Sequence, residues 1–151
     1  MFLEETGLAY KIFPVHIAKG EQFKPEFLAI SPNNRIPAIV DYQGPGGKPI
    51  SIFESGAILQ YLGRKTGKFY PSSERARVEV DQWLFWQVAG LGPMAGQANH
   101  FRHYAPERIA YATDRYTNER TTVHVVVGDE LAPTPVARGP VNFFGDAATG
   151  D

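Results

Sequence analysis

Cysteine is absent from this chain of 151 residues, and neither sign of charge dominates it. Without a thiol, the chain holds no disulfide, no thiolate zinc site and no cysteine nucleophile. The 15 Lys and Arg against 16 Asp and Glu give a net charge of −1, so the clustered positive charge that nucleic-acid phosphates require is missing. No run of about 18 apolar residues occurs, as a membrane-spanning helix would need. We therefore expect no nucleic-acid partner and no membrane association.

A secretory leader is also missing from the start of the sequence, where Glu4 and Glu5 stand in place of a basic segment and an apolar run. The composition, 43% hydrophobic and 21% charged, is typical of a folded globular protein. The length fits one domain or two small halves packed together. These features predict a cytoplasmic protein.

The first half of the chain alternates short elements. Their order is helix end, strand, helical turn, strand and strand, at residues 2–7, 10–17, 24–30, 38–40 and 50–53. Gly7 suits the left-handed position that ends a helix. Pro14 cannot donate a ladder hydrogen bond, which confines the first strand to a sheet edge or a bulge. A glycine-rich loop joins the last two strands into a hairpin.

Helical patterns dominate from Ser55 onward. Ser55 is expected to cap a helix that ends at Thr66-Gly67, and Pro71-Ser72-Ser73 resembles a linker. A second helix is predicted from Glu74 to about Val88, and a third over residues 107–120. Apolar side chains occupy nearly all faces of the second helix, which predicts that it is buried in the core or at a partner interface. The glycines and proline at 90–93 predict a kink after it.

The composition changes at residue 121. Residues 121–151 contain no Lys and a single Leu. The valines between positions 123 and 127 are β-prone and do not continue the helical period. We interpret this segment as an atypical tail, for which disorder is one reading.

Three familiar functional motifs are suggested by single residues but are not supported by the residues around them. The glycine-rich loop at 44–48 is not a phosphate loop, because Lys48 is followed by Pro49 and a strand rather than by Ser or Thr and a helix. Ser55 lacks the glycine two residues before it that a nucleophile elbow has. His100 and His103 lack a suitable third ligand nearby, so no metal site is predicted.

Two pairs of residues remain as a candidate binding site. Ile36-Pro37 precedes a strand, and Glu54-Ser55 follows the next strand at the start of a helix. Backbone groups held outside a ladder at Ile36 could pair with an extended peptide. A helix N-terminus with the Ser55 hydroxyl suits a carboxylate, and the Glu54 carboxylate suits an ammonium. Two interpretations stay open: a site for a small peptide with an amino-acid head, or an ordinary turn and an ordinary N-cap.

Over roughly residues 1–120, the chain resembles the glutathione S-transferase family, in particular its bacterial nu class and Ure2-like members. The resemblance rests on four segments in order, at residues 20–27, 31–41, 52–59 and 82–94. It implies an α/β thioredoxin-like N-terminal domain at 1–70, then an all-α C-terminal domain at 74–120, here truncated, and usually a homodimer. The family's first strand is missing between the strand at 10–17 and the strand at 38–40, so backbone groups there must find other partners.

The resemblance also assigns a site. It implies a cis peptide bond at Pro37, backbone pairing of Ile36 with the cysteinyl part of glutathione, and a γ-glutamyl contact at Glu54 and Ser55. Further contacts are implied at Gln22 and Arg115. No metal enters this site.

Glutathione would be the cosubstrate, its thiolate reacting with a small electrophile, a disulfide or a peroxide. The loop that stabilises the thiolate in the family is missing, so the catalytic residue is unassigned and we expect weak activity or none. The alternatives are a noncatalytic binding or regulatory protein and an inactive gene fragment. A truncated or frame-altered gene product is a further hypothesis, which the flanking DNA would test.

Overall fold

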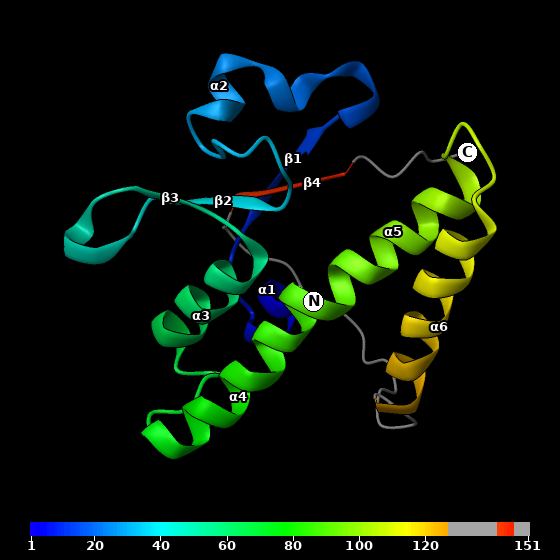
Figure 1. Ribbon diagram of the computed structural model, residues 1–151. Helices are drawn as coiled ribbons and strands as arrows, with labels where there is room; N and C mark the ends of the chain where they lie inside the picture. The colour runs from blue at the N-terminus through cyan, green and yellow to red at the C-terminus, as the bar shows by residue number, and fades with distance from the viewer. Residues whose placement is uncertain (127–141, 147–151) are drawn as a thin grey trace. The chain divides into compact units, whose positions relative to one another are not determined.

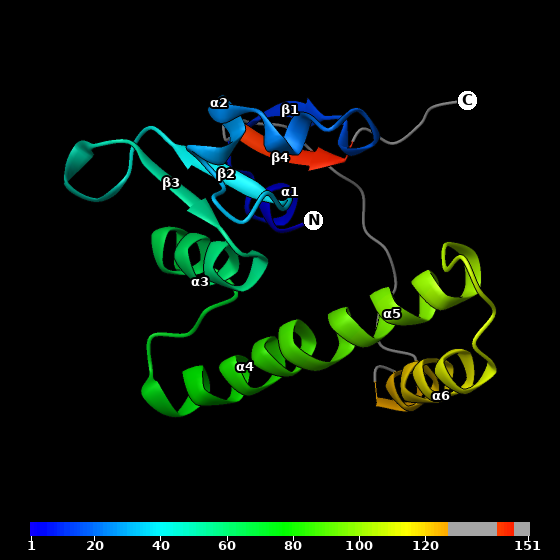
Figure 2. The same cartoon turned by 45° about the horizontal axis from the view of Figure 1, so that its top comes forward.

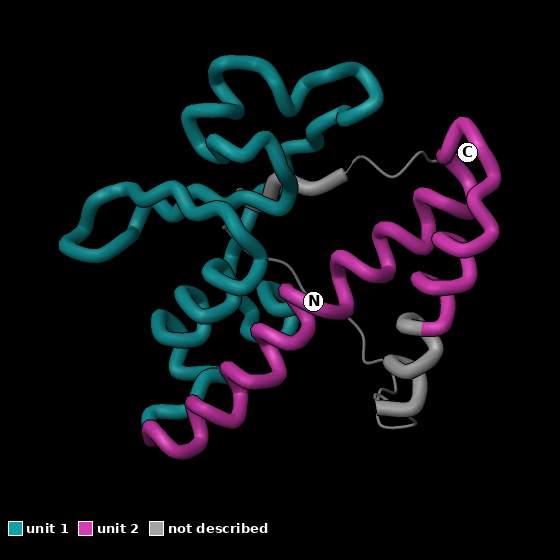
Figure 3. The backbone as a smooth tube through the Cα atoms, viewed as in Figure 1, with its two compact units in different colours: residues 1–72, 135–151 teal, residues 73–134 magenta. Residues whose placement is uncertain are grey.

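The computed structural model describes the backbone of residues 1–126 and 142–146. The chain divides into two compact units, residues 1–72 with 135–151 and residues 73–134 (Figure 3). We call them unit 1 and unit 2 and take each by itself. In the part of the chain that the structure describes, no helix is both long and apolar enough to cross a bilayer.

Unit 1 is an α/β unit built from short elements. In chain order they are α1 (Phe2–Thr6), β1 (Lys11–Val15), α2 (Pro25–Leu28), β2 (Ala38–Asp41), β3 (Ile50–Phe53), α3 (Ser55–Thr66) and β4 (Asn142–Asp146) (Figure 1). Gly7 and Gly67 end α1 and α3 with φ of 68° and 69°. At these angles a residue without Cβ is favoured. The helix ends predicted at both glycines are confirmed.

The described strands form one four-stranded sheet in the order β1-β4-β2-β3. β2 and β3 are an antiparallel hairpin in which Ala38 pairs with Phe53 and Asp41 with Ile50. β1 lies at the edge of the sheet, where Pro14 is tolerated because one side of an edge strand has no ladder to supply. The predicted hairpin and the predicted edge position of Pro14 are both confirmed.

β4 lies between β1 and β2, although it comes last in the sequence (Figure 2). It runs parallel to β1 and antiparallel to β2. This is the position from which the resemblance removes the family's first strand. The ladder groups that were expected to need other partners therefore pair with residues 142–146.

The core of unit 1 consists of two apolar clusters. One joins α1, β2 and α3 through Leu3, Ile39, Ile58 and Leu62. The other joins β1, α2 and β2 through Val15, Phe27 and Ala38. Ala38 and Ile39 are consecutive in β2 and both 0% exposed. Because consecutive strand residues point to opposite faces, β2 is covered on both sides.

A polar network fastens the hairpin to α3. The buried Asp41 carboxylate accepts hydrogen bonds from the Tyr61 hydroxyl at 2.5 Å, from the Gln43 amide at 2.9 Å and from the Lys65 ammonium. Burial raises the pKa of Asp41, but the hydrogen bonds from Lys65, Tyr61 and Gln43 outweigh it and hold this pKa below its usual value. Burial, followed by the hydrogen bond to Asp41, raises the pKa of Tyr61 to about 12.

Unit 2 is helical over its described residues. Its elements are α4 (Glu74–Trp86), a π-helical stretch (Gln87–Leu91), α5 (Gly92–His103) and α6 (Ala110–Val126). The π stretch lies where the glycines and proline predicted a kink. Between α5 and α6, the rings of Phe101 and Tyr116 stack with centroids 5.5 Å apart.

One expectation for unit 2 is wrong, and one of the two alternatives given for the second predicted helix is excluded. α6 continues through Val126 in place of β-prone structure from residue 123, because adding a residue to an existing helix costs far less than starting a new element. No residue of α4 is buried, and Trp83 and Phe85 are 55% and 60% exposed. The Trp83 and Phe85 rings are therefore not core; their place in a partner interface stays a prediction.

Candidate functional site

Ile36 and Pro37 lie just before β2. Their peptide bond is cis, as the resemblance implies. The β2 ladder begins at Ala38, which pairs with Phe53, so the Ile36 backbone lies outside it. The half-buried Ile36 side chain packs against the cluster of Val15, Phe27 and Ala38. Packing thus holds Ile36 in place next to the start of the β2 ladder.

Glu54 forms the turn from β3 into α3. Its φ of 70° and ψ of 116° lie in a region that residues with a Cβ rarely occupy. Glu54, not Ser55, is the N-cap of α3, and it makes no side-chain capping hydrogen bond. Ser55 is the first helical residue, so its predicted role as cap is wrong. This correction leaves the Ser55 hydroxyl at the N-terminus of a 12-residue helix, where it can meet a ligand carboxylate.

Asn33 connects the two segments. Its Nδ2 donates a hydrogen bond of 2.8 Å to Glu54 Oε1, and its Oδ1 accepts one of 3.3 Å from the Arg35 amide. The fully buried Ser31 supports this turn by donating to the Arg35 carbonyl at 2.7 Å. The sequence patterns above give Asn33 no part in the site. Its position two residues before Arg35 was the available signal, because Asn side chains often bond backbone two residues on.

Gln22 lies on the 3-10 turn Glu21–Phe23. Its Oε1 is buried and has no hydrogen-bond partner within the described part of the chain. The adjacent Glu21 fixes this turn by accepting from the His16 amide at 2.8 Å and the Lys24 ammonium at 3.1 Å. These bonds, the His16 amide first, lower the pKa of Glu21. A buried acceptor without a donor is costly, and a ligand N–H would satisfy it.

The predicted residues are thus only partly brought together. Asn33 ties the turn before Ile36 and Pro37 to Glu54, which Ser55 follows directly. Gln22 belongs to the same unit but not to that hydrogen-bonded cluster. Arg115 is exposed on α6 in unit 2. Its approach to glutathione stays a prediction.

A cavity of about 300 Å³ in unit 1 has Pro37 and Ser55 in its wall, together with mainly apolar residues of α1 and α3. It connects the cis proline with the start of α3. Among the residues the structure describes, no three His, Asp or Glu side chains gather in a way that could hold a metal ion.

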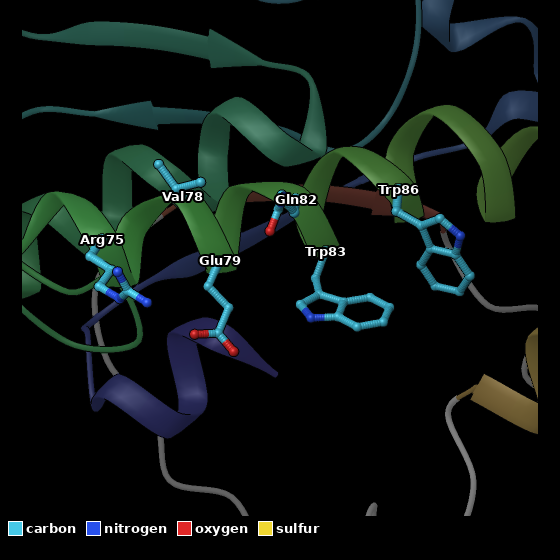
Figure 4. Close-up of a pocket in the computed structure, with 6 residues that line it drawn as sticks. All are labelled: Arg75, Val78, Glu79, Gln82, Trp83 and Trp86. Carbon is cyan, nitrogen blue, oxygen red and sulfur yellow. The ribbon is translucent and has the colours of Figure 1, made fainter.

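A larger hollow of about 850 Å³ lies along α4 in unit 2. Figure 4 shows Arg75, Glu79, Trp83 and Trp86 projecting from one side of that helix. The two indole rings meet edge to face with centroids 5.6 Å apart. One helix supplies every described residue of this wall, so polar groups do not converge on it from several elements as in a ligand site.

Comparison with known proteins agrees with this geometry. The family model described as the glutathione S-transferase N-terminal domain matches residues 1–64. The disulfide-bond oxidoreductase YfcG of Escherichia coli (strain K12) is 51% identical over 149 residues, which cover 98% of this chain and 69% of that protein. The chain belongs to the glutathione S-transferase family. Unit 1 contributes the thioredoxin-like N-terminal part of the transferase, and helices follow it.

Solved transferase structures extend the comparison. A glutathione transferase from Burkholderia graminis, with two glutathione molecules bound per subunit, is 44% identical and superimposes with a TM-score of 0.79. Ure2p in complex with glutathione is 38% identical, with a TM-score of 0.76. Each match covers 83% of this chain but only 53% and 58% of those chains. The chain therefore spans little more than half the length of these two relatives.

Proposed function

We propose that unit 1 binds glutathione and that this chain takes part in thiolate chemistry on disulfides. The observation that carries the proposal is the Asn33–Glu54 hydrogen bond, because it fixes the turn before the cis proline against the start of α3. Two relatives with solved structures hold glutathione, and a relative 51% identical is named a disulfide-bond oxidoreductase.

The roles follow from the chemistry of the tripeptide. The Ile36 backbone pairs with the cysteinyl residue in the manner of a strand. The Glu54 carboxylate takes the ammonium of the γ-glutamyl end, and the Ser55 hydroxyl with the α3 N-terminus takes its carboxylate. The buried Gln22 oxygen accepts from a ligand N–H. Arg115 is a further contact that we propose from the family resemblance alone.

The sulfur chemistry belongs to the ligand, since the chain has no cysteine. A glutathione thiolate attacks one sulfur of a disulfide, forms a mixed disulfide and releases the other half as a thiolate. A second glutathione attacks the mixed disulfide, which yields glutathione disulfide and frees the remaining thiol. The protein contributes position and orientation. Reduction of peroxides, transfer to small electrophiles, homodimerisation and a cytoplasmic location are parts of the same proposal.

Titration calorimetry with reduced glutathione and with S-methylglutathione tests the binding. We expect both to bind, because the proposed contacts involve the peptide ends and backbone rather than the sulfur. Glu54→Gln should weaken binding about tenfold or more, the equivalent of about 1.4 kcal/mol. Glu26→Gln, a change at an exposed carboxylate on α2, is the matched control and should bind as the unaltered chain does.

The outcomes separate the alternatives. No binding of either ligand would refute the proposed site. Binding without turnover of a disulfide substrate would instead favour a noncatalytic, regulatory protein. An equal loss in the Glu54 and Glu26 variants would show that the effect is one of net charge and not of the site.

A further inference from the structure

The direction of the Glu54 carboxylate depends on Asn33. The Glu54 side chain is exposed, so packing does not fix it. Within the described part of the chain, the hydrogen bond of 2.8 Å from Asn33 Nδ2 to Glu54 Oε1 is the contact that holds this carboxylate. Glu is among the side chains with the greatest rotamer freedom. Without the bond, its carboxylate would occupy many orientations.

The Asn33 amide is itself oriented by the turn in which it lies. The Arg35 amide can only donate, and it donates to Asn33 Oδ1 at 3.3 Å. The hydroxyl oxygen of the fully buried Ser31 lies 2.8 Å from the same Oδ1. With the amide oxygen turned to Arg35 and Ser31, Nδ2 faces Glu54 as a donor. The turn therefore anchors an exposed and flexible carboxylate to a buried residue.

We propose that Asn33 is a positioning residue that makes the γ-glutamyl subsite selective for an ammonium group. Asn33 Nδ2 occupies Glu54 Oε1 and leaves Oε2 to meet the ligand ammonium. This inference rests on the proposed binding of glutathione. It adds the residue through which that site distinguishes a ligand that carries the amine from one that lacks it.

The physical reason is preorganisation. A carboxylate that is already held in one orientation loses less freedom when the ammonium arrives, so more of the interaction appears as affinity. The Asn33 amide is neutral, so it orients the Glu54 carboxylate and leaves its negative charge for the ligand. A Lys or Arg in its place would compete with the ammonium for that charge. The effect of Asn33 should thus be confined to the amine end of the tripeptide.

Titration calorimetry of the full chain with two ligands tests this role. The ligands are glutathione and glutaryl-cysteinylglycine, in which hydrogen replaces the ammonium. In Asn33→Ser, the shorter hydroxyl side chain can still bond the turn backbone, but it does not reach Glu54. We expect Asn33→Ser to weaken glutathione binding about three- to tenfold and to change binding of the analogue by less than about twofold.

The neighbouring Asn34 provides a matched control. Its φ of 51° suits glycine, and its side chain makes none of the hydrogen bonds that join the turn to Glu54. Asn34→Gly removes an amide side chain one residue away, and it should bind both ligands as the unaltered chain does. Equal losses of both ligands in Asn33→Ser would show that Asn33 only supports the turn, which overturns the proposal.

A double-mutant cycle requires glutathione alone. If Asn33 acts through Glu54, Asn33→Ser should change glutathione binding by less than about twofold in a Glu54→Ala chain. The same loss in both backgrounds would overturn the proposal. Glutathione binding that Asn33→Ser leaves intact would remove the role of Asn33 but keep the proposed function. If the unaltered chain does not bind glutathione, the proposed function fails, and the role of Asn33 fails with it.

Discussion

Backbone strain at Glu54 predicts a conflict between stability and binding. Its φ of 70° and ψ of 116° are unfavourable for any residue that carries a Cβ. Glycine has no Cβ, so Glu54→Gly relieves the strain and at the same time removes the carboxylate. Glu54→Ala removes the same carboxylate but keeps the Cβ. Comparing the two variants isolates the backbone contribution.

The expected difference follows from two opposing effects. An unusual backbone conformation of this kind costs about 1–3 kcal/mol, which glycine recovers. Glycine loses about 0.4–1 kcal/mol through the greater freedom of its unfolded chain. The hydrogen bond from Asn33 Nδ2 is lost in both variants and cancels. The middle of the two ranges, about 2 kcal/mol gained against about 0.7 kcal/mol lost, makes the glycine variant more stable than the alanine variant by about 1.3 kcal/mol.

Thermal unfolding followed by calorimetry measures this difference. For a chain of this size we expect the glycine variant to unfold about 2–6 °C above the alanine variant, and both to bind glutathione at least about tenfold more weakly than the unaltered chain. A glycine variant no more stable than the alanine variant would refute the strain argument. Unchanged glutathione binding in both variants would remove Glu54 from the proposed site.

Two further predictions concern other parts of the chain. Asp41→Asn should lower stability by about 1–3 kcal/mol at neutral pH. Because the folded-state pKa of Asp41 is lowered, the ionised carboxylate stabilises the fold above its unfolded-state pKa. The difference in free energy of unfolding between the unaltered chain and the variant should therefore shrink as pH falls from about 5 through the folded-state pKa. A difference that does not change with pH would contradict this. Gly63→Ala places a Cβ 2.5 Å from the Tyr70 Cβ and should destabilise the chain by about 1–3 kcal/mol. A Cβ at Gly96 in α5 meets no atom within 4 Å, so Gly96→Ala should stabilise the chain by about 1 kcal/mol. Urea unfolding measures both changes, and changes of the same sign would refute the contrast.

Local signals in the sequence were sufficient for much of unit 1. The helix ends at Gly7 and Gly67 and the hairpin of β2 and β3 depend on neighbouring residues, so they could be predicted. The N-cap of α3 could not, because Ser is the common capping residue and nothing local indicates that Glu54 takes a strained conformation. Asn33 is a similar case, since its bond to Glu54 spans 21 residues.

β4 and the exposed rings of α4 required knowledge beyond local pattern. The segment 142–146 is short, contains a glycine and pairs with strands more than 100 residues away. Periodicity carries no information about such a partner. The aromatic residues of α4 matched a buried helix by composition, but exposure depends on which helices cover it. The cis peptide bond between Ile36 and Pro37 was expected from the family resemblance, whereas the hydrogen bond from Asn33 to Glu54 was not.

The strand order also determines when each unit can form. Unit 2 is one continuous stretch of the chain, residues 73–134, so it can begin to fold as soon as those residues have been synthesised. Unit 1 is interrupted, and the partner that β1 has among the described strands exists only when residues 142–146 have been synthesised. Pairings between segments so distant in sequence are slow to form. During synthesis, the segment that enters the sheet last is therefore the one that joins β1 to it, and until then β1 is exposed to pairing with other chains.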